Sequence, residues 1–106
     1  MSGVERIAAE RKRQIEVERR TPEHDEQHRY GELPIAAACY AVHTTHARVL
    51  GPNGQDAWPW SPDWDKRWKH NCIRRLEIAG ALIAAEIDRL IRADPQAERG
   101  RSFPER

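Results

Sequence analysis

A proline-interrupted tryptophan segment, residues 56–68, constrains the fold of this chain more than any other feature. It holds all four tryptophans of the 106-residue sequence, two of them in the run Trp58-Pro59-Trp60-Ser61-Pro62. Proline lacks a backbone N–H and clashes with the preceding helical turn, so this run cannot continue a helix. The chain is therefore expected to fold as helical segments on either side of an aromatic loop.

The flanking segments carry helical periodicity. Residues 3–20 place apolar side chains at helical spacing in a thin stripe, and Thr21-Pro22 has the residue types of a fresh helix start. A second main helix is expected to open at residues 32–34, and its almost wholly apolar run 35–42 makes it the most buried. The third and longest is expected over residues 65–93. Its apolar face is predicted to comprise Ile73, Leu76, Ala79, Gly80, Ile83, Ile87 and Leu90.

These segments predict an all-α fold: a three-helix core with an extra short helix and a Trp/Pro-rich loop. We expect a single helical domain over residues 1–95 and a flexible charged tail over 96–106, because Asp94-Pro95 stops the last helix. The small residues 79–81 are expected to form a groove in which another helix packs. The thin stripe of the first helix and this small-residue face suggest more apolar surface than one monomer hides, which favours a homo-oligomer.

Composition narrows the function classes. The formal net charge is +1, which argues against a strongly electrostatic nucleic-acid binder, and no specific nucleic-acid binding is expected. No apolar run is long enough for a membrane span, and the N-terminus lacks a signal-peptide apolar region. Cys39 and Cys72 are too few for a disulfide framework. A cytoplasmic protein with free thiols is therefore expected.

The aromatic loop and its basic neighbours are the best candidates for a ligand site. Flat indole rings can stack on bases, while guanidinium groups offer a planar fork for phosphate. The candidate ligand-binding residues are Trp58, Trp60, Trp68, Arg74, Arg75, Arg11 and Glu86. Two structural alternatives stand beside this interpretation, namely tryptophans that cap the helical core and arginines on a solvated helix face. For any single arginine, a place on a solvated helix face is the more usual role.

Glu86 is singled out because it lies on the apolar face of the third helix. A carboxylate there must be paired, protonated or facing a cleft. Its structural alternative is an ion pair with an arginine of the first helix. Glu32 and Glu86 also resemble the carboxylates of helical nucleotide pyrophosphohydrolases, but the repeated Glu-x-x-Glu spacing of such enzymes is missing. Hydrolysis is therefore ranked below binding, and no catalytic residue is assigned.

Two histidine pairs have the spacing to share a helix face, namely His24 with His28 and His43 with His46. Imidazoles at such spacing can ligate a transition metal, but no third ligand is fixed by the spacing. Exposed or capping histidines are the simpler interpretation. We therefore assign neither a metal nor a cofactor.

The order of motifs along the chain resembles a group of small conserved proteins of bacteriophages and prophages of proteobacteria. The resemblance covers roughly residues 5–93, although the group usually has Gly-Trp where this chain has Arg19-Arg20. The motifs that carry it are Glu10-Arg11-Lys12-Arg13-Gln14, Thr21-Pro22-Glu23-His24-Asp25, Gly31-Glu32-Leu33, Ala36-Ala37-Ala38-Cys39-Tyr40-Ala41, Trp58-Pro59-Trp60, Arg74-Arg75-Leu76 and Ala79-Gly80-Ala81-Leu82-Ile83-Ala84-Ala85-Glu86-Ile87.

This resemblance implies a phage accessory protein acting in the cytoplasm of the bacterial host. Small proteins of that kind often counter host defence by sequestering cyclic nucleotide signals or by blocking a defence protein. The leading hypothesis is that the chain binds, without catalysis, a nucleotide-type ligand or immune signal. The alternatives are a protein-binding inhibitor of a host defence factor, with the tryptophans as interface anchors, and a metal-dependent nucleotide pyrophosphohydrolase.

Overall fold

The structure is a computed structural model that describes residues 1–42 and 47–96. Its elements are α1 (Gly3–Glu16), α2 (Pro22–Glu26), α3 (Glu32–Ala41), η1 (Pro62–Trp64), η2 (Arg67–Lys69) and α4 (Cys72–Ala93), where η marks a 3-10 turn. The described ranges contain no strand, only an isolated antiparallel bridge between Leu50 and Asp56. The all-α prediction is confirmed. His43, His46 and the predicted tail beyond Gln96 lie outside the described residues.

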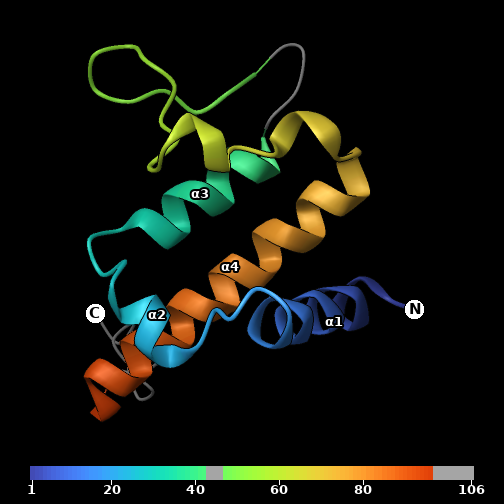
Figure 1. Cartoon of the computed structure of the whole chain (residues 1–106), viewed down its shortest axis with the longest axis vertical. Coiled ribbons are helices and arrows are strands. Elements are labelled where there is room, and N and C mark those ends of the chain that lie inside the picture. Colours follow the sequence, from blue (N-terminus) through green and yellow to red (C-terminus); the bar gives the residue numbers. More distant parts are fainter. Residues whose placement is uncertain (43–46, 97–106) are drawn as a thin grey trace, which may run out of the picture.

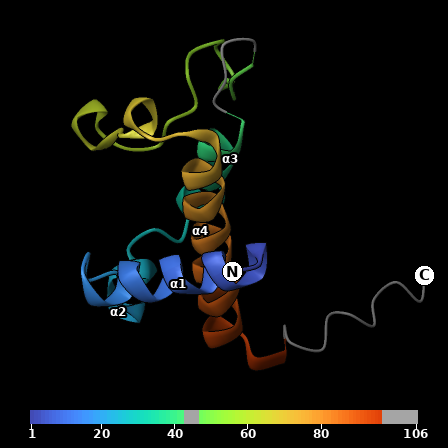
Figure 2. The same cartoon turned by 90° about the vertical axis from the view of Figure 1, so that its right-hand side faces the viewer.

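The long helix α4 organises the fold. α3 lies alongside it and runs in the opposite direction (Figure 1). α1 crosses α4 near its middle (Figure 2), and α2 packs against the C-terminal half of α4. The Trp/Pro-rich loop with η1 and η2 lies beyond the C-terminal end of α3 and leads into the start of α4. None of the described helices has the length and apolar composition needed to cross a bilayer.

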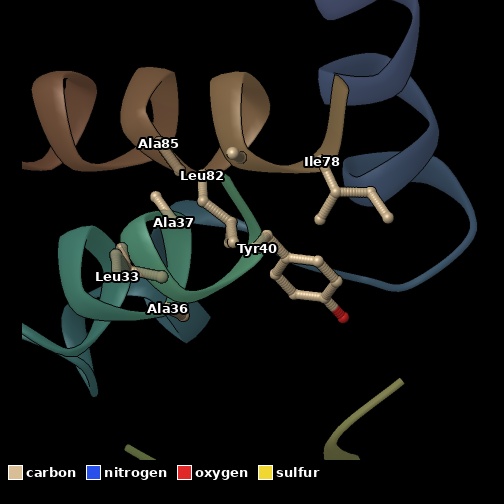
Figure 3. Packing of buried hydrophobic residues seen from close by; sticks show 8 residues of the cluster. Leu33, Ala36, Ala37, Tyr40, Ile78, Leu82 and Ala85 are labelled. Carbon is tan, nitrogen blue, oxygen red and sulfur yellow. The ribbon is translucent and has the colours of Figure 1, made fainter. Parts of the chain in front are cut away.

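Small residues hold α3 against α4. The core consists of Leu33, Ala36, Ala37 and Tyr40 from α3 and Ile78, Ala79, Leu82 and Ala85 from α4 (Figure 3). Alanine at half of these positions lets the two backbones approach closely. The prediction that the segment after residue 32 is the most buried helix is confirmed.

The predicted groove at residues 79–81 is also confirmed, because α1 packs into it. A Cβ atom added to Gly80 would lie 2.6 Å from Cδ1 of Ile7, so a larger residue there would force the Ile7 side chain to shift. The predicted apolar face of α4 is not the face that packs against α3. The core uses Ile78, Leu82 and Ala85 instead, and of the predicted set only Ala79 joins them.

Two helix boundaries differ from the prediction for local reasons. α1 ends at Glu16 rather than residue 20, because Arg19 has a left-handed backbone (φ 59°) and the Arg20 N–H turns back to donate to the Gln14 carbonyl. α4 begins at Cys72 rather than residue 65. The Asn71 side chain caps it by accepting the Arg74 N–H at 2.8 Å, and residues 65–71 instead complete the loop.

Candidate functional site

A cavity of about 880 Å³ opens between α1, α2, the end of α3, the aromatic loop and the first half of α4. Its size falls within the roughly 300–1,000 Å³ range of small-molecule sites. The large aromatic lining residues are Tyr40, Trp58, Trp60 and Trp64, joined by the imidazoles of His24, His28 and His70. The charged lining residues are Arg13, Arg20, Lys66, Lys69 and Arg74, with the carboxylates of Glu10 and Glu18.

The aromatic wall is a continuous series of ring contacts. Tyr40 contacts Trp58 with ring centroids 5.7 Å apart, Trp58 contacts Trp60 at 5.4 Å, and Trp60 contacts His28 at 5.1 Å. Trp58 and Trp60 also pack against the hydrophobic core. The same two rings thus pack against the core and line the cavity.

Burial sets the protonation of the imidazole at the end of this series. Burial lowers the pKa of His28, and the nearby His24 lowers it further. His28 is therefore neutral at pH 7. It presents a flat, uncharged ring beside Trp60.

Arg67 holds the aromatic loop in place. Its buried guanidinium donates to Asp65 at 2.9 and 2.6 Å and to Asp56 at 3.1 Å, and its Cζ lies 5.1 Å from the Trp58 ring centroid. Asp56 in turn accepts the Trp58 N–H at 2.9 Å. Sequence reasoning missed Arg67, although an arginine flanked by aspartates in a tryptophan-rich loop was a usable signal for such a clamp.

Two tryptophans of the loop project into solvent, and only one of them lines the cavity. Trp64 in η1 is 69% exposed and is a lining residue. Trp68 in η2 is 76% exposed and is not among the lining residues that the structure describes. The candidate set from the sequence contained Trp68 and omitted Trp64. The two lie in successive 3-10 turns, whose orientation the sequence does not reveal.

A buried carboxylate organises the charged wall. Glu10 is 3% exposed and accepts from Arg13 at 2.8 and 3.0 Å, and it pairs with Arg74 at 2.7 Å. Burial raises the pKa of Glu10, but the two guanidinium groups outweigh it, so the net pKa is lowered and the carboxylate stays ionised. Arg74, a predicted ligand residue, thus lies at the cavity and is paired with two carboxylates, Glu10 and Glu77.

The cavity keeps an excess of positive charge. Five cationic side chains line it against two carboxylates. Glu18 forms ion pairs with Arg13 and Arg20. Lys66 and Lys69 make no ion pair within the described ranges, so their ammonium groups are available to an anion at the rim.

Gln14 presents a buried acceptor at the cavity wall. Its side chain is 1% exposed, and its Nε2 donates to Glu10 at 3.1 Å. An ionised carboxylate only accepts hydrogen bonds, so this contact fixes the amide with Oε1 pointing elsewhere. Gln14 Oε1 and the Trp60 Nε1 donor both make no hydrogen bond within the described part of the chain. Within the described part of the chain, three cavity-lining residues thus carry a buried side-chain atom without a hydrogen-bond partner, namely Gln14 Oε1, Trp60 Nε1 and His24 Nδ1.

Besides Trp68, three predicted ligand residues lie away from the described cavity lining, namely Arg75, Arg11 and Glu86. Arg75 donates to the His70 carbonyl and, at 3.3 Å, to Cys72 Sγ. Its side chain is thereby held at the start of α4.

Arg11 lies between α2 and α4, where it pairs with the buried Asp25 at 3.4 Å and with Asp88 at 3.6 Å. Burial raises the pKa of Asp25 even though Arg11 opposes that shift. Glu86 accepts from Arg89 of its own helix at 2.8 and 3.0 Å. The expected partner of Glu86 on the first helix is therefore wrong. Both predicted residues have structural partners.

The remaining candidates for metal chemistry have ordinary contacts. His24 and His28 meet edge to face with ring centroids 5.1 Å apart, and Glu32 accepts the Tyr30 N–H at 2.8 Å. Across residues 1–42 and 47–96, no group of three or more His, Cys, Asp or Glu side chains is arranged to hold a metal ion.

No family model, curated protein or solved structure matches this chain. Functional interpretation therefore rests on the chemistry of the cavity.

Proposed function

We propose that this protein binds a planar, anionic small molecule of the nucleotide class in the cavity and sequesters it. The observation that carries the proposal is that one cavity combines tryptophan rings, an excess of positive charge and a buried, unpaired acceptor. A nucleotide matches all three, because it has an aromatic base, phosphates and polar base edges. The resemblance to phage accessory proteins favours an immune signal of the bacterial host as the ligand.

The exposed ring of Trp64 is the proposed stacking platform for the base. Within the described residues no other ring or cation stacks on it, whereas Arg67 occupies a face of Trp58 and Arg20 lies 5.9 Å from the Trp60 centroid. A base stacked on one aromatic side chain gains about 1–3 kcal/mol. Lys66 and Lys69 then supply charge to the phosphates.

Gln14 and Trp60 are the proposed readers of the base edge. Gln14 Oε1 accepts, so the ligand has to donate, and Trp60 Nε1 donates, so the ligand has to accept. An exocyclic amino group beside a ring nitrogen supplies both. The proposal therefore favours amino-bearing bases such as adenine over bases without that donor.

Sequestration fits the cavity better than hydrolysis does. Glu10 is held by Arg13 and Arg74, and Glu18 is held by Arg13 and Arg20, so each cavity carboxylate is committed to guanidinium groups. A general base or a magnesium ligand needs a carboxylate that is available to water or metal. The proposal accordingly assigns no catalytic residue.

The test is to incubate the purified protein with a mixture of linear and cyclic nucleotides, with and without magnesium. The protein is then separated, denatured by heat, and the released molecules are identified by chromatography and mass spectrometry. Recovery of an unchanged nucleotide is the expected result. Recovery of new products would mean that the protein hydrolyses the nucleotide instead of sequestering it. Absence of any retained nucleotide would favour the protein-partner alternative, which the exposed Trp68 also suits as an interface anchor.

The base-reading role of Gln14 has its own test. Wild type is expected to bind adenosine monophosphate at least fivefold tighter than purine riboside monophosphate, which lacks only the amino donor, because an unsatisfied buried acceptor costs about 1–3 kcal/mol. Gln14→Met keeps the side-chain length and removes the acceptor, so it should abolish this discrimination. If wild type and Gln14→Met discriminate equally between the two ligands, Gln14 does not contact the base. The proposed stacking on Trp64 would be unaffected by that result.

A further inference from the structure

One face of α4 carries an apolar stripe that the fold leaves half exposed. Ile73, Leu76, Ile83, Ile87 and Leu90 are 46–60% exposed. With Gly80 they recur at alternating intervals of three and four residues, which is the heptad spacing of helices that pair along a seam. A stripe of this length on a monomer marks an interaction surface.

Of the six stripe positions only Gly80 is covered by another element of the described chain, because Ile7 of α1 lies over it. α3 uses the face of α4 that carries Leu82 and Ala85. α1 crosses at Gly80, where Ile7 fills the space above the glycine, and its neighbour Val4 is 78% exposed. α1 thus adds apolar side chains to the edge of the stripe. The cavity-lining residues of α4 belong to a different face, so the stripe and the cavity can be occupied together.

The stripe is complementary to itself when its direction is reversed. Its positions are symmetric about the midpoint between Ala81 and Leu82. An antiparallel second copy therefore sets Ile73 opposite Leu90, Leu76 opposite Ile87, and Gly80 with its covering Ile7 opposite Ile83. This reciprocity is the property of a two-fold interface, in which the same patch serves both subunits.

Charge does not oppose this pairing. Glu77 and Glu86 flank the stripe, and each already has a partner: Glu77 pairs with Arg6 and Arg74 at 3.0 Å, and Glu86 pairs with Arg89 at 2.8 Å. No charged residue occupies any of the six stripe positions. Pairing therefore buries apolar side chains without bringing an uncompensated charge into the interface.

We propose that two copies of this chain form an antiparallel dimer along the α4 stripe. The stripe extends from Ile73 to Leu90 of the 22-residue helix α4, about 26 Å at 1.5 Å per residue, so the contact spans about two and a half heptads. The occupant is a second copy because the reversal symmetry matches this surface to itself. The dimer carries one cavity per subunit, and each cavity faces away from the pairing stripe.

Light scattering after size exclusion tests the interface. Wild type should have twice the 12.3 kDa mass of the chain at micromolar concentrations. Ile83→Glu should give a monomer with an unchanged helical circular dichroism spectrum. Val17→Glu is the matched control, because Val17 is an exposed apolar residue outside the stripe, and it should stay dimeric. A monomeric wild type, or a dimeric Ile83→Glu, would overturn the proposal.

Cysteine cross-linking tests the direction of pairing and does not depend on how Ile83→Glu folds. Leu76→Cys and Ile87→Cys are each made in a Cys72→Ser background, which removes the exposed native thiol. Mild oxidation of a mixture of the two should give a covalent dimer, and oxidation of either alone should not. Cross-linking of each variant with itself would mean parallel pairing and would overturn the antiparallel arrangement. No cross-link in any sample would also overturn it.

Discussion

Replacing Arg67 by methionine should release the aromatic loop from the helical core. The buried guanidinium makes three short side-chain hydrogen bonds to Asp65 and Asp56 and lies over the Trp58 ring. Removing one member of a buried ion-paired set costs about 3–5 kcal/mol. The side chains of Asp56 and Asp65 keep 28% and 24% exposure, so water can solvate them after the change, which places the expected loss near 3 kcal/mol.

Thermal unfolding followed by circular dichroism measures this loss. For a domain of this size, 3 kcal/mol corresponds to a fall in Tm of about 12–24 °C. The near-ultraviolet tryptophan signal should weaken below the transition as well, because Trp58 loses its fixed environment. Arg75→Met is the matched control, since Arg75 bonds a carbonyl and a thiol at the surface, and its Tm should change by only a few degrees. A variant Arg67→Met that melts like wild type would refute the clamp.

Three further changes test other parts of the account. Gly31→Ala should cost about 1–2 kcal/mol in an unfolding titration, because Gly31 opens α3 at φ +91° and the added Cβ meets no close neighbour that could add a packing cost. Glu10→Gln should lower stability by about 2 kcal/mol in the same titration while strengthening binding of an anionic ligand, because Arg13 and Arg74 lose a shared partner beside the cavity. The pKa of His28 is lowered on folding, so the unfolded chain binds the extra proton at a higher pH than the folded chain does. The free energy of unfolding should therefore decline as pH falls below ~6.5. His28→Gln should reduce this dependence of stability on pH. Weakened anion binding in Glu10→Gln, or an unchanged slope in His28→Gln, would contradict the respective assignment.

Much of the fold followed from local sequence signals. Proline in the tryptophan segment separates α3 from α4, and Thr21-Pro22 begins α2 as its residue types indicate. Small residues predicted both the buried α3 and the groove at Gly80. These features could be predicted because each depends on the backbone of one short segment.

The core face of α4 could not be predicted from the pattern, for a physical reason. Two apolar stripes run along this helix, one with Ile78, Leu82 and Ala85 and one with the heptad spacing of Ile73 and Ile83. Periodicity identifies apolar faces but not their partners. Helix α3 packs on the stripe that contains the alanines, because small side chains let the two backbones approach.

The candidate site was predictable only in part. Trp58, Trp60 and Arg74 line the cavity, whereas Arg11 and Glu86 are engaged in ion pairs elsewhere. Long charged side chains reach several possible partners, so their pairing depends on tertiary distances that spacing along one helix does not give. Gln14 gave no signal in sequence, because its role arises from burial next to Glu10.

The most direct test of the central claim is a calorimetric titration of wild type, Trp64→Ala and Trp68→Ala with the nucleotide recovered from the retention experiment. Both tryptophans are exposed, so neither substitution should lower Tm appreciably, and only Trp64 lines the cavity. The cavity account predicts that Trp64→Ala weakens binding by about 5- to 150-fold, the equivalent of one stacking contact of ~1–3 kcal/mol, while Trp68→Ala binds like wild type. Equal affinities for all three proteins, or a loss confined to Trp68→Ala, would contradict it.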